Sequence, residues 1–123
     1  MNSNELQLRL KNFAYRIVKL CEALPPGRIS KIIEDQLLRA SFSAAANYRS
    51  SCKAISRKAF VAKLSIAFEE ADETLFWLEA IQEIPLLPEN KMTAIIQEAK
   101  ELSSILAASR KTSQSKIAPN LKS

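Results

Sequence analysis

Residues 36–79 read QLLRASFSAAANYRSSCKAISRKAFVAKLSIAFEEADETLFWLE. Apolar residues recur in this stretch at spacings of three and four, which is typical of amphipathic helices. The pattern predicts two long helices joined by a tight turn. Small and polar residues share one stripe of the first helix, formed by Ala40, Ser43, Ala44 and Asn47. We therefore expect another helix to approach that stripe closely.

Composition supports a helical domain. The chain has 123 residues, enough for one domain with its own core, and 47% of them are hydrophobic and 25% charged. A single glycine and five prolines outside the periodic segments favour helices over a sheet, whose turns need glycine. Two cysteines, Cys21 and Cys52, are too few for a disulfide framework and fit a reducing compartment. Without a signal-like or membrane-spanning segment, we expect a soluble cytoplasmic protein with no membrane contact.

Breaks between the periodic segments predict four helices. The first break is Pro25-Pro26-Gly27, and the last is residues 84–88, which contain two prolines. Between them, the chain breaks just before Ser56, which is a plausible N-cap for the next helix. The expected helices cover about 4–24, 28–51, 57–83 and 88–109. Short connections between them predict an all-α, antiparallel up-down-up-down four-helix bundle over residues 1–109. The polar, basic residues 110–123 are predicted to be a disordered tail.

Charge is distributed unevenly along the chain. Residues 36–68 contain six basic and no acidic residues, whereas residues 69–83 contain six acidic and no basic ones. The bundle topology should gather basic side chains at one pole: Arg9, Lys11, Arg49, Lys53, Arg57, Lys58, Arg110 and Lys111. Acidic side chains should gather at the other: Glu22, Glu34, Asp35, Glu79, Glu83 and Glu89.

The basic pole has two interpretations. It can hold a phosphate backbone of RNA or DNA without reading sequence, or it can be an ordinary solvated surface. The only ring expected near this pole is Tyr48, and one ring is not a stacking platform.

The third helix carries more large apolar residues than one core face holds. Ile66 and Trp77 lie eleven residues apart, about three turns, and share a face away from the core stripe. Phe76 adds to this excess. We predict that Ile66, Phe76 and Trp77 form an oligomer interface, the alternative being that the fourth helix covers the rings.

The inventory of catalytic residues argues against an enzyme. Without histidine, the chain has no Ser-His-Asp or Cys-His site and no histidine metal site. Glu69, Asp72 and Glu73 share a helix face, but a charged surface explains them better than acid–base chemistry. We expect no metal and no cofactor. The polar residues expected to be structural are Arg39, in contact with Glu69 or Glu70, and Asn47.

Several motifs resemble a known family. The motifs are QLLRASFS at 36–43, ANYR at 46–49 and EADETLFWLE at 70–79, with Phe60, Lys63-Leu64 and Ile66-Ala67 before the last one. Together they are similar to motifs of the four-helix-bundle proteins related to the 23S ribosomal RNA intervening-sequence protein. The resemblance covers about residues 13–84. The chain departs from it at Ser50-Ser51, where family members often carry glycine or glutamate.

The resemblance implies an antiparallel four-helix bundle that assembles into a ring-shaped homopentamer. Its members are encoded in insertions within ribosomal RNA genes and in many bacterial genomes, and have no established enzymatic activity. A related accessory protein of diversity-generating retroelements binds reverse transcriptase and, through a basic pentameric surface, nucleic acid.

Two functional hypotheses follow. In the first, a basic ring binds RNA or DNA through Arg49, Lys53, Arg57, Lys58, Arg110 and Lys111. In the second, the exposed rings of the third helix and the acidic pole dock another protein.

Overall fold

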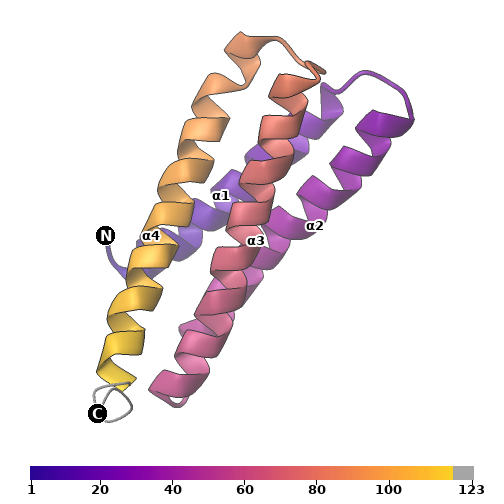
Figure 1. The fold of residues 1–123 in the computed structure, drawn as a ribbon. Helices are drawn as coiled ribbons and strands as arrows, with labels where there is room; N and C mark the ends of the chain where they lie inside the picture. The colour runs from indigo at the N-terminus through magenta and orange to yellow at the C-terminus, as the bar shows by residue number, and fades with distance from the viewer. Residues whose placement is uncertain (118–123) are drawn as a thin grey trace.

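Four long helices pack against one another in the computed structural model, which describes residues 1–117. They are α1 (Ser3–Glu22), α2 (Arg28–Ser51), α3 (Arg57–Glu83) and α4 (Thr93–Ile117), with a short 3-10 turn, η1 (Glu89–Lys91), before α4; residues 1–117 contain no strand. Figure 1 shows the α2–α3 turn at the lower end of the molecule, close to the end of α4. The other two connections lie at the upper end. We call the lower end the α2–α3 end.

Local sequence signals set the helix boundaries. Asn2 accepts a hydrogen bond from the Glu5 amide at 2.8 Å, and the Glu5 side chain accepts one from the Asn2 amide at 3.1 Å, which completes a capping box for α1. Ser56 accepts from the Ala59 amide at 3.0 Å and is the N-cap of α3, as predicted. Gly27 has φ 138° before α2, a conformation that side chains rarely allow.

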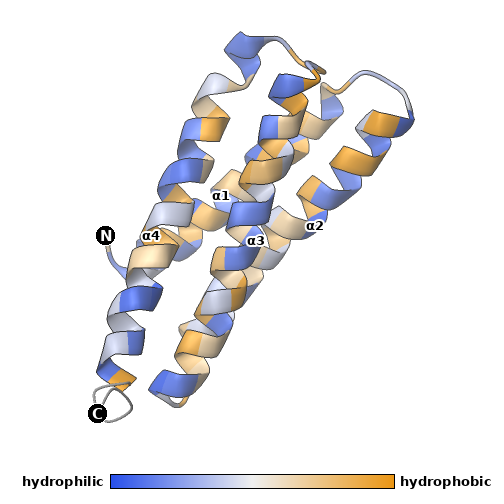
Figure 2. Cartoon of the chain, viewed as in Figure 1, coloured by the Kyte–Doolittle hydropathy of each residue, from blue (hydrophilic) through white to orange (hydrophobic). Residues whose placement is uncertain are grey.

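One hydrophobic core runs through all four helices. Its fully buried large side chains are Leu10, Ile17, Leu37, Leu64, Leu78, Ile81, Met92, Leu102 and Leu106. Each contributes about 1.5–3 kcal/mol through burial. Figure 2 shows hydrophobic and hydrophilic residues alternating around each helix, as this one-sided burial requires. Ala40 and Ala44, both buried on α2, lack bulk and let neighbouring helices approach it.

The beginning of α1 differs from the prediction that Arg9 lies at the basic pole. Figure 1 shows the N-terminus beside the middle of α4, not at its end. Arg9 accordingly contacts Glu98 and Glu101 of α4. Two features explain this: α1 has 20 residues and α4 has 25, and α1 runs obliquely to α4 in Figure 1, so α1 does not reach the α2–α3 end.

The prediction that α4 fades near residue 109 and is followed by a disordered tail is wrong for residues 110–117. The helix continues to Ile117. Tertiary contacts hold this last part, because Ser113 is buried and the Arg110 guanidinium lies 4.5 Å from the centre of the Phe68 ring on α3. The rest of the predicted tail, 118–123, lies outside the described residues. The predicted start at residue 88 is also early, since residues 89–91 form the 3-10 turn.

Candidate nucleic-acid interface

The α2–α3 turn is short and internally bonded. The Ser51 hydroxyl is buried and donates to the Tyr48 carbonyl at 2.6 Å, and the Ala54 amide donates to the Ser51 carbonyl at 3.0 Å. These bonds satisfy the last carbonyls of α2 within the turn. Within the turn, Lys53 and Ile55 face solvent, and Ile55 is fully exposed.

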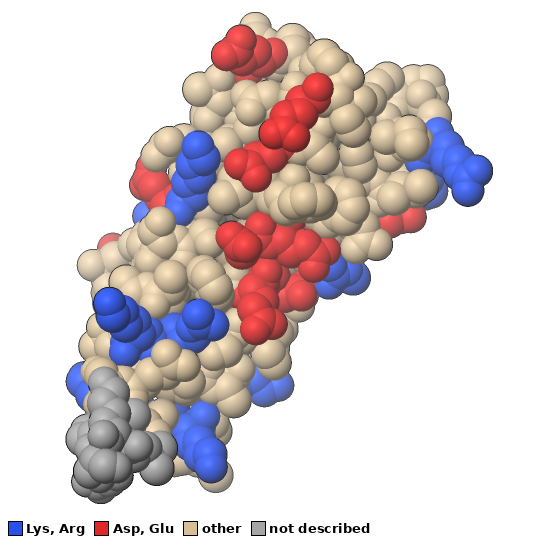
Figure 3. All heavy atoms as spheres, viewed as in Figure 1, with Lys and Arg blue, Asp and Glu red and all other residues tan. Residues whose placement is uncertain are grey.

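Basic residues surround this turn. Four predicted contact residues are exposed on the end of α2, the turn and the first turn of α3: Arg49, Lys53, Arg57 and Lys58. Lys111 on α4 is also exposed, whereas Arg110 is half-buried against Phe68. In Figure 3, basic side chains gather toward the α2–α3 end on the face shown, and acidic ones lie farther up. Within residues 1–117, none of these six cations makes an ion pair.

Several cations farther from the turn have carboxylate partners instead. The Arg9 guanidinium donates to Glu98 at 2.8 and 2.6 Å and to Glu101 at 2.9 Å. The hydrogen bonds to Glu98, with a smaller contribution from Glu101, hold the pKa of Arg9 above its ordinary value. Lys19 and Lys31 pair with carboxylates on their own helices.

The charges of α3 oppose its helix dipole. Its first turn has no acidic residue and contains Arg57 and Lys58, while its last turn has no basic residue and contains Glu83. Cations at a helix N-terminus add to the partial positive charge of the free amides there and cost about 0.3–1 kcal/mol each at low salt. The α2–α3 end therefore concentrates positive potential from side chains and backbone together.

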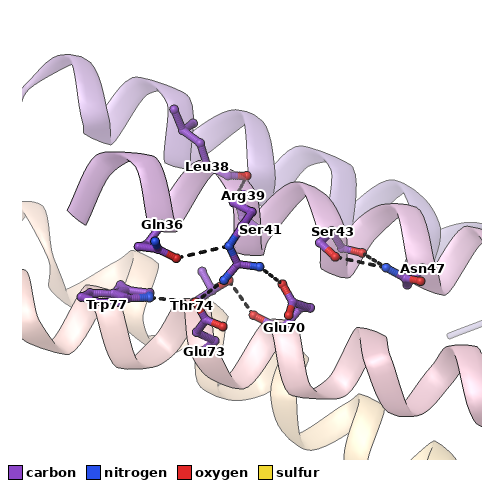
Figure 4. Close-up of polar contacts among 10 residues, drawn as sticks. All are labelled: Gln36, Leu38, Arg39, Ser41, Ser43, Asn47, Glu70, Glu73, Thr74 and Trp77. Atoms are coloured by element: carbon purple, nitrogen blue, oxygen red, sulfur yellow. Dashed lines mark hydrogen bonds and ion pairs between the residues drawn. The ribbon is translucent and has the colours of Figure 1, made fainter. Parts of the chain in front are cut away.

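A polar network joins α2 and α3 higher up (Figure 4). Of the two partners expected for Arg39, the structure provides Glu70, at 2.7 Å, and adds Glu73. Glu73 also accepts from the Trp77 indole at 3.0 Å. The Trp77 bond first, and then the bond from Arg39, lower the pKa of Glu73 below its ordinary value.

The other two expected structural residues have different surroundings. Asn47 donates to the Ser43 carbonyl at 2.9 Å and to the Ser43 hydroxyl, so its bonds stay within α2. Glu69 is exposed and, among residues 1–117, forms no ion pair.

The three residues predicted at an oligomer interface divide into two groups. Phe76 is 59% exposed and Ile66 is 40% exposed, so both present apolar surface to solvent. Trp77 is half-buried, packs against the core and meets Phe76 edge-on with ring centroids 5.0 Å apart. Its bond to Glu73 fixes the ring in that position.

Sequence reasoning missed one aromatic pair. Tyr48 is buried, with 5% exposure, and is not available at the surface. Tyr15 on α1 and Phe42 on α2 are instead exposed, with ring centroids 6.1 Å apart. A signal was present, because Lys11 and Tyr15 share one face of α1 and Phe42 and Arg49 share one face of α2, by spacings of four and seven.

The described part of the chain holds no group of three or more cysteine and acidic side chains placed to bind a metal ion. Cys21 is buried, and burial raises the pKa of its thiol to about 11, which keeps it protonated and unreactive. Among the helices of residues 1–117, none is sufficiently long and apolar to cross a membrane.

Comparison with known proteins identifies the family. The family model described as 23S rRNA-intervening sequence protein matches residues 4–108. The chain belongs to this 23S rRNA-intervening sequence protein family. A crystal structure of a protein of unknown function from the S23 ribosomal protein family of Bacteroides thetaiotaomicron is 32% identical, with a TM-score of 0.81. The match covers 90% of this chain and 99% of that one, and no curated protein matches the chain.

Family membership agrees with the resemblance seen in the sequence motifs. It also agrees with the four-helix architecture. The matched range ends at residue 108, so Arg110 and Lys111 lie just outside the part that defines the 23S rRNA-intervening sequence protein family.

Proposed function

We propose that this protein is not an enzyme and binds nucleic acid through the α2–α3 end. The contacts are made by Arg49, Lys53, Arg57, Lys58, Arg110 and Lys111. One observation carries the proposal: these cations lack carboxylate partners within residues 1–117, while Arg9 and Arg39 nearer the middle each have two. Unpaired cations bind phosphates by releasing counterions and need no base contacts.

The arrangement of α3 supports the same proposal. Arg57 and Lys58 stand where the helix dipole disfavours a cation, so they reduce the stability of the free protein. An anion bound at the α2–α3 end offsets this loss of stability, because it interacts favourably with both the side-chain charges and the free amides of the first turn.

We further propose that the bundle is antiparallel and assembles into a ring-shaped homopentamer through the exposed face of α3. Ile66 and Phe76 expose apolar side chains on that face, and the half-buried Trp77 packs edge-on against Phe76. Five copies would present five basic ends to one strand. Multivalent contact of this kind raises affinity by about 10²–10⁴-fold without a new kind of contact.

A salt titration tests the nucleic-acid proposal. Protein freed of nucleic acid is titrated into a fluorescently labelled RNA, and binding is followed by anisotropy at about 50 and about 200 mM salt. About six phosphate contacts per copy predict a loss in affinity of at least about 100-fold between these conditions. Absence of binding at low salt, or affinity that does not change with salt, would overturn the proposal.

A second candidate function is the binding of another protein. The observation that favours it is the 59% exposure of Phe76, because large exposed rings are enriched at protein interfaces. Light scattering separates this candidate from self-assembly. If the wild type has the mass of five chains and Phe76→Ala has a lower mass, the face belongs to the homopentamer interface. A monomer whose mass is the same with and without that substitution would exclude self-assembly through this face and leave it available to a different protein.

A further inference from the structure

A groove between α1 and α2 has features that the phosphate-binding proposal does not use. It has a volume of about 200 Å³, and its lining includes three small side chains: the buried Ala14 of α1 and Ala45 of α2, and the exposed Ala46 of α2. Tyr15 and Phe42 form its walls, 51% and 41% exposed, with their ring planes tilted by 53°. Both ring side chains therefore keep solvent-accessible surface beside these small residues.

Two cations complete this groove. Lys11 lies one turn before Tyr15 on α1, and Arg49 lies two turns after Phe42 on α2; both line the groove. Because α1 runs toward the α1–α2 connection and α2 runs away from it, both cations lie on the side of the rings that faces the α2–α3 end (Figure 1). None of the described residues that line the groove is acidic.

This combination of groups matches single-stranded nucleic acid. Stacking on an aromatic ring needs an unpaired base with a free face, and it tolerates any sequence because every base has such a face. Phosphates next to the stacked base then meet Lys11 and Arg49. Gln7, also in the lining, offers an amide that can donate to and accept from a base edge.

We propose that the α1–α2 groove binds one or two unpaired bases of a single-stranded RNA, stacked on Tyr15 and Phe42. Arg49 belongs both to the groove and to the α2–α3 end, so the strand continues from the rings to Lys53, Arg57 and Lys58. The inference rests on the proposed nucleic-acid binding and specifies its substrate. A duplex keeps its bases stacked inside, so it reaches the cations and not the rings.

The test compares two RNAs and two matched variants. The probe is a short RNA carrying one 2-aminopurine, a fluorescent base that is quenched by stacking, used single-stranded and annealed to its complement. Tyr15→Leu with Phe42→Leu removes the rings but keeps apolar bulk at two exposed positions. Ile29→Ala is the control, because it removes apolar bulk from a comparably exposed position of α2 that lies outside the groove and outside the proposed interface.

The expected result is a selective loss. The Tyr15→Leu, Phe42→Leu variant should bind the single strand about 10-fold more weakly per ring lost and should no longer quench the 2-aminopurine. Its affinity for the duplex and the affinities of Ile29→Ala for both RNAs should equal those of the wild type.

Each contrary result has its own meaning. If the wild type binds neither RNA, the proposed function fails and the groove inference fails with it. If the double variant binds the single strand as tightly as the wild type, the groove inference alone is overturned. If that unchanged binding comes with a changed solution mass, the groove is covered by a second copy of the chain, which also overturns it.

Discussion

Two arginines in the middle of the bundle and the cations at its α2–α3 end have opposite surroundings. In the middle, Arg39 bonds Glu70 and Glu73, and Arg9 bonds Glu98 and Glu101, so each guanidinium joins two helices. At the α2–α3 end, Lys53, Arg57 and Lys58 are exposed and, among described residues, have no carboxylate partner.

This difference separates charges that stabilise the fold from charges that are available to a ligand. A cation between two carboxylates has its potential cancelled locally and contributes little to attraction at a distance. A group of unpaired cations retains its potential within about 8–10 Å at physiological salt and attracts polyanions. Substitutions in the two regions should therefore affect different measurements.

The largest expected effect is on affinity. Replacing Lys53, Arg57 and Lys58 together by glutamine should weaken RNA binding by about 100-fold at about 0.1 M salt, because three phosphate contacts are lost. Anisotropy with a labelled RNA measures it. The fold should be retained, since all three side chains are exposed.

The control for this variant removes the same charge elsewhere. Arg28, Lys31 and Lys91 are exposed and lie near the α1–α2 and α3–α4 connections, at the opposite end. Glutamine at these three positions should leave RNA affinity within about 3-fold of the wild type, a loss expected from long-range charge alone. Equal losses in the two triple variants would mean that net charge, and not the α2–α3 end, governs binding.

A smaller effect is expected from breaking the network in the middle. Arg39→Ala leaves Glu70 and Glu73 without their cation and should lower the free energy of unfolding by about 1–2 kcal/mol. Urea denaturation measures this loss, with the fluorescence of Trp77 as the probe. RNA affinity should be unchanged; an RNA defect with normal stability would contradict the division between the two regions.

Acid should weaken the same network. The Glu73 pKa lies below its ordinary value of 4.5, through the bond from Trp77 and then from Arg39. A carboxyl whose pKa is lowered by folding adds stability above its unfolded pKa, and that stability is lost as pH falls through the folded pKa. Between about pH 7 and about pH 3, Glu73→Gln should therefore lose less stability than the wild type, as measured by urea denaturation. Identical losses would exclude this role for Glu73.

The smallest effect should be a gain in stability. Arg57→Gln with Lys58→Gln removes two cations from the N-terminus of α3, where the dipole disfavours them. The variant should be more stable by about 0.5–1 kcal/mol at low salt, and the gain should shrink as salt screens the dipole. A loss of stability would show that these cations support the fold, contrary to their assignment to a ligand.

Sequence periodicity predicted the helices and part of the polar network. The spacing of apolar residues placed α2 at 28–51 and α3 at 57–83, where the structure has them. Pairing these two helices through their turn predicted that Arg39 contacts Glu69 or Glu70, and the structure has Glu70. The second carboxylate, Glu73, and the indole bond could not be predicted, because they depend on side-chain rotamers that helical spacing does not determine.

The misses share one physical cause, which is contact between segments distant in sequence. Residues 110–117 carry few apolar side chains, and their helix depends on Arg110 meeting Phe68 and on the burial of Ser113. Similarly, Tyr48 is buried and Tyr15 and Phe42 meet across two helices. A single helix pattern shows which face a residue occupies and leaves open which neighbour covers it.

The most direct test of the central claim is the slope of log affinity against log salt for RNA, in the wild type and in the variant with glutamine at positions 53, 57 and 58. If the three side chains contact phosphates, the slope for a single strand should fall by about 0.7 for each contact, about 2 in total. Parallel lines for the two proteins would show that these cations do not contact the phosphates, and would contradict nucleic-acid binding at the α2–α3 end.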